Sequence, residues 1–254
     1  MPTEPYADKF GARVEHSRFR SAHLPRTSWR LQREKATAQQ NLADIACYDG
    51  AIAYLDQQVG QLLDELQRRG QLGNTLVIIT ADHGEEFGEH GHYGHVDSAY
   101  LTQLRVPLVL ALPGAIPAGR AITVPVSLRD LPATVMETLN LKADFPGVSL
   151  TRHWREPGRK EGARKEGAPK EGAPLLSEIN VAPILVRQYP AGGKAVITSL
   201  VYDRYHYLKN PDGREELYDF VNDPAETQNL VSSGSAGGAQ PLSPILEPSN
   251  LTRE

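Results

Sequence analysis

The residues most able to do chemistry lie together in the stretch 80–95. Its sixteen residues include four glycines, four histidines (His83, His90, His92 and His95) and four carboxylates (Asp82, Glu85, Glu86 and Glu89). Asp82 and His83 can offer a divalent cation adjacent oxygen and nitrogen ligands, and the glycines let the backbone approach a bound group. The later histidines could bind an anion when protonated or a metal when neutral. A polar surface loop is the alternative, but this density of side chains favours a functional site.

Two other kinds of site are excluded by their motifs. A helical zinc site of the His-Glu-x-x-His type does not fit, because His83 is followed by Gly84. The single cysteine, Cys47, rules out an intrachain disulfide and any multi-cysteine zinc site. No proline or arginine follows Cys47 at the spacing of a nucleophile motif, so we interpret it as a structural cysteine.

The stretch 80–95 begins where a predicted strand ends. Residues 75–80 form a short, β-branched, apolar run without alternation, which is typical of a central strand buried on both faces of a parallel sheet. A second such run covers 106–112 and ends at Pro113 and Gly114. Because open α/β sheets bind ligands beyond the carboxyl ends of their strands, residues 82–95 stand where a site is expected.

Two helices complete the predicted α/β pattern. The clearer one spans about 34–69, ends at Gly70, and has an apolar stripe that we expect to be buried. The second is expected at about 131–139, with Asp130 as its N-cap. The order helix, strand, loop, strand, helix predicts the α/β class. The stripe of the first helix consists of Leu42, Ile45, Ile52, Leu55, Val59, Leu62 and Leu66.

The composition divides the chain into four parts. Residues 1–150 carry the α/β pattern. Residues 151–175 contain three near-copies of a Lys-Glu-Gly-Ala unit with no side chain able to enter a core, so we expect a disordered insertion. Residues 176–230 form a predicted C-terminal α+β subdomain. The Ser-, Gly- and Pro-rich residues 231–254 are expected to be a disordered tail.

The subdomain is expected to contain a small antiparallel sheet. Residues 195–201 and 202–209 are β-prone, and the sequence Asn-Pro-Asp-Gly at 210–213 is a strong turn signal. Residues 215–220 can return from this turn as a partner strand.

Charge and hydropathy exclude several function classes. The 254 residues carry a formal net charge of −4 with no dominant acidic or basic tail, which argues against a nucleic-acid partner. No run of about 18 apolar residues is present, so no membrane span is expected. The first twenty residues contain no apolar segment typical of a secretory signal, and the sequence leaves the cellular compartment open.

Several motifs in the same order resemble the sulfatases of the alkaline-phosphatase superfamily. They are Asn-Thr-Leu-Val-Ile-Ile-Thr-Ala-Asp-His-Gly-Glu at 74–85, Gly-Glu-His-Gly at 88–91, Arg-Val-Pro-Leu at 105–108, and Glu-Leu-Tyr-Asp at 216–219. The resemblance covers about 1–150 and 176–230. It implies a partial alkaline-phosphatase-like fold, with a mixed or parallel sheet flanked by helices.

The resemblance also implies roles for three residues. Asp82 and His83 match the second pair of ligands to the catalytic divalent cation, which in sulfatases is commonly calcium, with magnesium or manganese as alternatives. His95 matches a catalytic position, usually lysine or histidine, that contacts the sulfate group. The implied substrate is a sulfate ester of a small molecule or a glycan. A cation and a protonated side chain would both stabilise the charge that its cleavage builds.

Other features of the family are not found in this sequence. The family's nucleophile is a cysteine or serine of a Cys/Ser-x-Pro-x-Arg motif, oxidised to formylglycine, and no such motif occurs here. The family's first metal-ligand pair, Asp-Asp, is also absent, and Thr3 stands where the family has an active-site histidine. We therefore expect the resemblance to cover only the second half of a sulfatase, with the N-terminal half as a partner and this chain inactive by itself. The alternatives are a phosphodiesterase or phosphonate-ester hydrolase of the same superfamily, and a degenerate fragment without enzymatic function.

Overall fold

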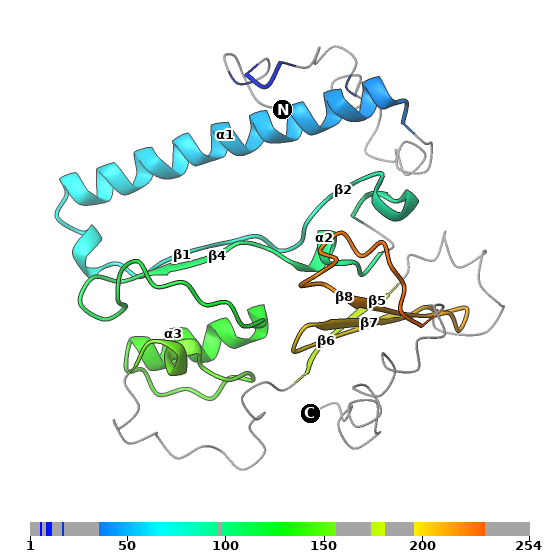
Figure 1. The fold of residues 1–254 in the computed structure, drawn as a ribbon. Coiled ribbons are helices and arrows are strands. Elements are labelled where there is room, and N and C mark those ends of the chain that lie inside the picture. Colours follow the sequence, from blue (N-terminus) through cyan, green and yellow to red (C-terminus); the bar gives the residue numbers. More distant parts are fainter. Residues whose placement is uncertain are drawn as a thin grey trace. The chain divides into compact units, whose positions relative to one another are not determined.

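A computed structural model describes residues 6, 9–11, 17, 36–95, 98–155, 174–180 and 196–231 (Figure 1). The chain divides into two compact units, and each is described by itself. The first consists of Met1–Ser98 and Thr102–Pro113, and the second of Ala99–Leu101 and Gly114–Glu254.

The first unit begins with the long helix α1 (Ala38–Arg68). It starts at a capping box, in which the Thr37 hydroxyl accepts from the Gln40 backbone N–H and the Gln40 side chain accepts from the Thr37 N–H. Past its last turn the chain reverses at Gly70, which has a φ of +66°. The predicted stop is confirmed, and the helix starts four residues later than predicted because Thr37 caps it.

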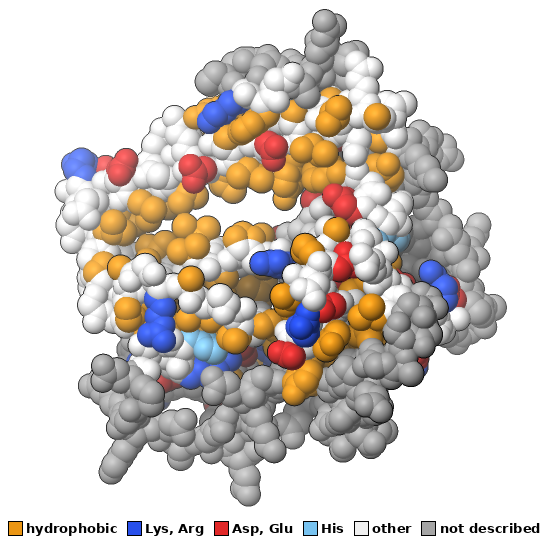
Figure 2. Space-filling view, viewed as in Figure 1, with side chains coloured by type: hydrophobic (Ala, Val, Ile, Leu, Met, Phe, Trp, Pro, Cys, Tyr) orange, Lys and Arg blue, Asp and Glu red, His pale blue; other side chains and the backbone are white. Residues whose placement is uncertain are grey.

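The predicted burial of the α1 stripe is wrong for the described part of the chain. Its members Leu42, Ile52, Leu55 and Leu62 are 50–64% exposed. The buried positions are smaller residues in the first half of the helix: Ala43, Asp44, Ala46, Cys47 and Gly50. Figure 2 shows hydrophobic side chains along this helix. The stripe is exposed because the described elements that pack on α1 are chiefly the 3₁₀ helix η2 (Leu72–Asn74) and a short strand of the next loop.

Strands β1 (Val77–Thr80) and β4 (Leu108–Ala111) form a two-stranded antiparallel sheet. The expectation of parallel strands buried on both faces is wrong for this pair, because it is antiparallel and because Ile79 is 37% and Val109 51% exposed. An unbroken apolar run predicts a strand but carries no information on the direction of its partner. The chain between them forms a second, two-stranded hairpin and a short helix. These are β2 (Glu86–Phe87), the 3₁₀ helix η3 (Glu89–Gly91), β3 (Tyr93–Gly94) and α2 (Leu101–Leu104).

The second unit contains α3 (Leu131–Thr138) between the 3₁₀ helices η4 (Leu128–Asp130) and η5 (Leu150–His153). Asp130 is the N-cap residue, as predicted, but its side chain makes no cap hydrogen bond. Its carboxylate instead accepts from the Val148 N–H at 2.9 Å, which holds the segment before η5. Residues 151–155, where the disordered insertion was predicted to begin, instead form part of η5 and the turn after it. Residues 156–173 lie outside the described residues.

A four-stranded antiparallel sheet, in the order β5-β6-β7-β8, forms the rest of the second unit. Its core is Leu200, Tyr207 and Leu217. The predicted turn is confirmed, with Gly213 at a φ of +87° and its N–H donating to Asn210 O. The outer strand β5 was not predicted, and residues 232–254 lie outside the described residues. The strands are β5 (Leu175–Asn180), β6 (Val196–Tyr202), β7 (Tyr205–Lys209) and β8 (Glu215–Asp219).

Candidate active site in the loop after β1

Asp82 and His83 follow the end of β1 directly and present their side chains to solvent. The side chains of Asp82 and His83 are 90% and 43% exposed. The His83 ring nitrogen Nδ1 lies 2.8 Å from Gly84 O, and because a carbonyl only accepts, Nδ1 carries the proton. The lone pair of neutral His83 therefore sits on Nε2, which lies 3.6 Å from Asp82 Oδ2. An oxygen and a nitrogen donor are thus offered side by side.

His95 comes back to the same place from the far end of the loop. Its ring stacks on that of His83, with centroids 4.2 Å apart and planes 25° apart. Its Nδ1 lies 3.2 Å from both carboxylate oxygens of Glu85, whose side chain is only 16% exposed. Glu85 therefore orients the ring, and Nε2 is the nitrogen of His95 that remains available to another group. The three residues predicted from the sequence, Asp82, His83 and His95, are brought together.

The other two histidines of the stretch lie elsewhere in the loop. His90 is inside η3 with a φ of +53°, in the left-handed region that non-glycine residues rarely adopt. His92 follows η3, and its N–H donates to Glu89 O at 2.8 Å. Both histidines thus belong to the backbone turn at η3 rather than to the stacked ring pair of His83 and His95.

Sequence reasoning missed a buried carboxylate below the loop, Glu86, which is 2% exposed. Its oxygens accept from Ser98 Oγ at 2.8 Å, Thr102 Oγ1 at 3.2 Å and Gln103 Nε2 at 3.2 Å. Burial raises the pKa of Glu86 above its ordinary value, although these hydrogen bonds and the nearby His92 act in the opposite direction. No local pattern predicts this pairing, because the partners of Glu86 lie 12 to 17 residues away along the chain.

Gly84 packs against the backbone of α2 more closely than any other residue type would allow. Its N–H donates to Gln103 O at 2.7 Å. A Cβ at this position would lie 1.9 Å from Thr102 O. Glycine is therefore needed here for close approach rather than for a special φ.

The donor set of the described residues fits part of a divalent cation site. Within the ranges that the structure describes, no group of three or more His, Cys, Asp or Glu side chains is placed to hold a metal. Asp82 and His83 supply two donors of the right chemistry, one hard oxygen and one imidazole nitrogen, facing solvent and held by local hydrogen bonds. They fit a cation that takes its remaining ligands from other groups.

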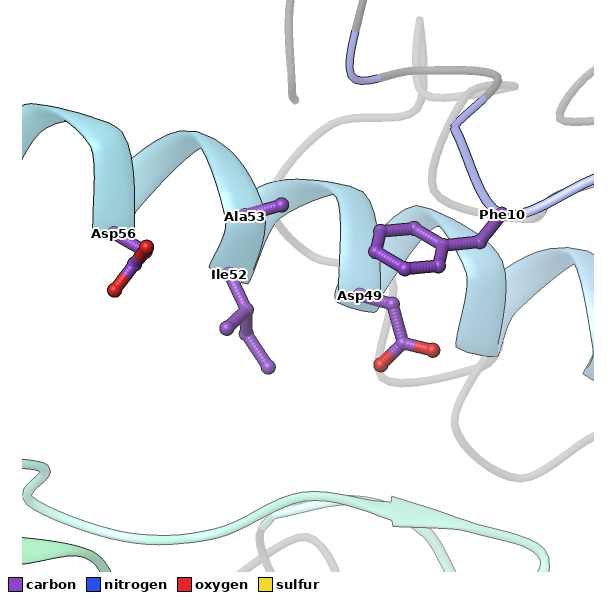
Figure 3. Close-up of a pocket in the computed structure, with 5 residues that line it drawn as sticks. All are labelled: Phe10, Asp49, Ile52, Ala53 and Asp56. Atoms are coloured by element: carbon purple, nitrogen blue, oxygen red, sulfur yellow. The ribbon is translucent and has the colours of Figure 1, made fainter.

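A shallow hollow on α1 lies apart from these side chains. Phe10 lies over the helix, beside Asp49, Ile52, Ala53 and Asp56 (Figure 3). None of the predicted site residues lines it. Elsewhere, no helix among the described residues is both long enough and apolar enough to cross a membrane.

Comparison with known proteins gives a consistent result. Residues 15–141, half of the chain, match the family model described as Sulfatase. Choline-sulfatase of Rhizobium meliloti (strain 1021) is 29% identical over 192 residues, which is 73% of this chain and 33% of that protein. The N-acetylglucosamine-6-O-sulfatase of Bacteroides thetaiotaomicron is 28% identical over 196 residues, 76% of this chain and 32% of that protein. The chain thus spans about one third of the length of these curated relatives.

Solved structures confirm the fold class. The crystal structure of the phosphonate monoester hydrolase of Agrobacterium radiobacter matches with a TM-score of 0.66 and 26% identity. The match covers 80% of this chain and 40% of that one. The expected partial α/β fold of the alkaline-phosphatase type is therefore confirmed, with the small antiparallel sheet as its C-terminal part.

Proposed function

The chain belongs to the sulfatase family, and from this we propose that the protein hydrolyses sulfate esters with Asp82, His83 and His95 at the reacting site. The observation that carries the proposal is the convergence of these three side chains from both ends of the loop, with the two rings stacked at 4.2 Å. The proposal concerns the whole protein, because the chain spans about a third of its curated relatives.

Asp82 and His83 are proposed as two ligands of a calcium ion. Calcium is a hard cation that binds oxygen ligands in flexible geometry, so the Asp82 carboxylate would suit it. His83 Nε2, 3.6 Å from Asp82 Oδ2, would be the second donor. Such a cation would supply Lewis-acid stabilisation of the charge on the ester oxygens.

His95 is proposed to contact the sulfate group and not the metal. Glu85 accepts from its Nδ1, and in the protonated ring Nε2 also carries a hydrogen, which it can donate to a sulfate oxygen. A hydrogen bond that strengthens as negative charge develops lowers the barrier to ester cleavage.

The substrate class is proposed as a small-molecule or glycan sulfate ester. The names of the relatives support both, since one is a choline-sulfatase and another an N-acetylglucosamine-6-O-sulfatase. The 254 residues contain no Cys/Ser-x-Pro-x-Arg motif, so we expect no turnover of an aryl sulfate by this chain alone.

A phosphonate monoester hydrolase is the second candidate. The match to the Agrobacterium radiobacter enzyme supports it, since that structure is 26% identical over 80% of this chain. The two candidates differ in the group transferred. Turnover of 4-nitrophenyl sulfate against that of 4-nitrophenyl phenylphosphonate, by the protein that includes the nucleophile segment, separates them.

The test of the metal ligands is a calcium titration by calorimetry combined with an activity assay, both on the protein that includes the nucleophile segment. We expect Asp82→Asn to lose both calcium binding and activity. Asp56→Asn, which changes an exposed carboxylate on α1, is the matched control and should change neither. His95→Ala should keep calcium and lose activity. Loss of calcium from His95→Ala, with retention in His83→Ala, would show that the roles are assigned wrongly.

A further inference from the structure

We propose that Gln103 is the positioning residue that holds His83 against His95. It does so by hydrogen-bonding to both ends of the loop that separates them. The proposal rests on the proposed function only for its effect on the reaction. Its structural part concerns the geometry of the loop and stands by itself.

Gln103 reaches the two ends of the loop with different atoms. Its backbone carbonyl accepts from the Gly84 N–H at 2.7 Å, directly after His83. Its side-chain Nε2 donates to Gly94 O at 2.6 Å, directly before His95. One residue therefore contacts the chain neighbours of both rings, although nine residues lie between Gly84 and Gly94.

The orientation of the Gln103 amide is determined by its surroundings. Gly94 O can only accept, so the amide atom next to it must be the NH₂ group. The same nitrogen lies 3.2 Å from Glu86 Oε2. Gln103 is 4% exposed and Glu86 2% exposed, so solvent does not compete for these bonds.

Glu86 is in turn held from the other side of the cluster. Ser98 Oγ donates to Glu86 Oε1 at 2.8 Å, and Ser98 is itself 4% exposed. Gly84 itself approaches the backbone of α2 closely, since an added Cβ would lie 1.9 Å from Thr102 O. The buried polar cluster and this close backbone packing together hold the two ends of the loop that carry the stacked rings.

The reaction needs this fixation because a misplacement of about 1 Å in a reacting group can cost about 10²-fold in rate. His83 and His95 are proposed to act on the cation and on the sulfate group, so their separation sets the distance between the two. Gln103 touches neither group and acts through the backbone at Gly84 and Gly94.

The test is an NMR measurement on the chain with its eight histidines labelled with ¹³C. The NOE between the His83 and His95 rings reports their separation. Gln103→Met keeps the backbone carbonyl but removes the amide, and we expect it to abolish this NOE. Glu86→Gln keeps an acceptor for the Gln103 amide and should retain it. Gln57→Met, an exposed position on α1, is the matched control and should leave the NOE unchanged.

His206, buried in the C-terminal sheet, serves as an internal control of folding. If the His206 signals also change in Gln103→Met, that variant is perturbed throughout, and the NOE is measured in Gln103→Asn instead. The side chain of this second variant stays polar but is one methylene too short to reach Gly94. A wild-type NOE in the folded Gln103 variants would overturn the proposal.

The activity arm separates this inference from the proposed function. In the protein that includes the nucleophile segment, we expect Gln103→Met to lower kcat by about 10²-fold with little change in KM. If the NOE is lost and the protein hydrolyses no sulfate ester in its wild-type form, the positioning role stands and the proposed function fails. If the NOE is lost but kcat is unchanged, the catalytic importance of Gln103 is refuted.

Discussion

At the scale of single residues, the proposed site depends on side chains that differ sharply in exposure. Asp82 and His83 face solvent, as the proposed ligands of an incoming cation should. Glu86 and Gln103 are buried and hydrogen-bonded to each other, whereas the half-buried Glu85 contacts the His95 ring. We propose that the buried pair holds the backbone from which the exposed groups act.

Gly84→Ala is expected to displace the loop. The new Cβ would meet Thr102 O at 1.9 Å, and both the clash and the bond to Gln103 O involve backbone, which cannot rotate away. We expect faster hydrogen exchange across residues 84–95 and loss of calcium binding. Gly73→Ala, where nothing lies within 4 Å of the new Cβ, is the control and should show neither effect. Wild-type exchange in Gly84→Ala would contradict the close packing described for this residue.

At the scale of elements, the C-terminal sheet carries two buried polar clusters that tie its strands to other segments. In one, Ser199 of β6 lies 2.7 Å from His206 Nε2, and His206 Nδ1 is hydrogen-bonded to Glu226. Glu226 also accepts from the Leu101 N–H at 2.7 Å. The side chains of this hydrogen-bonded series, Ser199–His206–Glu226, are all at most 2% exposed. They therefore stabilise the sheet and are not accessible to a substrate.

Glu226→Ala is expected to destabilise this sheet. It leaves His206 Nδ1 and the Leu101 N–H without their buried acceptor, at a cost of about 1–3 kcal/mol for each. The measurement is hydrogen exchange of β6 and β7. Glu215→Gln, at an exposed position of the same sheet, should cost less than about 1 kcal/mol. Equal protection in the two variants would show that the buried cluster contributes little.

The second cluster makes the sheet sensitive to acid. Burial raises the pKa of Glu216, but hydrogen bonds from Tyr218, Tyr100 and Asn210 outweigh it and hold the pKa below its ordinary value. A carboxyl with a lowered folded-state pKa stabilises the fold above its unfolded pKa, and this contribution is lost as the pH falls through the folded-state value.

We therefore expect protection of β8 against exchange, corrected for intrinsic rates, to fall on acidification below about pH 4.5. Glu216→Gln should make this dependence flatter, and Glu215→Gln should leave it as in the wild type. An unchanged acid dependence in Glu216→Gln would assign the effect to other carboxyls.

At the scale of the whole molecule, the described residues leave much apolar surface in contact with water. Leu55 is 61% and Leu62 59% exposed on α1, and Val109 of β4 is 51% exposed. Large apolar side chains left in water in this way promote association.

The chain is therefore expected to self-associate when purified by itself. Leu55→Lys combined with Leu62→Lys should shift sedimentation velocity profiles toward the monomer. Gln57→Lys combined with Gln61→Lys adds the same charge to exposed polar positions of α1 and should have a smaller effect. A monodisperse monomer formed by the unmodified chain would refute this expectation.

The elements that local chemistry specifies could be predicted from the sequence. Gly70, the turn at 210–213 and the α/β class follow from glycine, proline and periodicity, which act over a few residues. The candidate residues Asp82, His83 and His95 were found because they are close in sequence and follow a predicted strand. The structure brings the rings of His83 and His95 together, and the chemical roles of all three residues remain predictions.

What only the tertiary structure decided depends on contacts between distant residues. The antiparallel pairing of β1 with β4, the exposure of the α1 stripe and the strand β5 are set by which partners each segment meets. Glu86 and Gln103 carried no local signal, because a carboxylate and an amide become positioning groups only when folding buries them together. The sequence by itself thus determined which residue types stand after the strand and which of them are candidates for the chemistry. The tertiary structure decided what holds them in place, because burial and hydrogen bonding arise between segments and not within them.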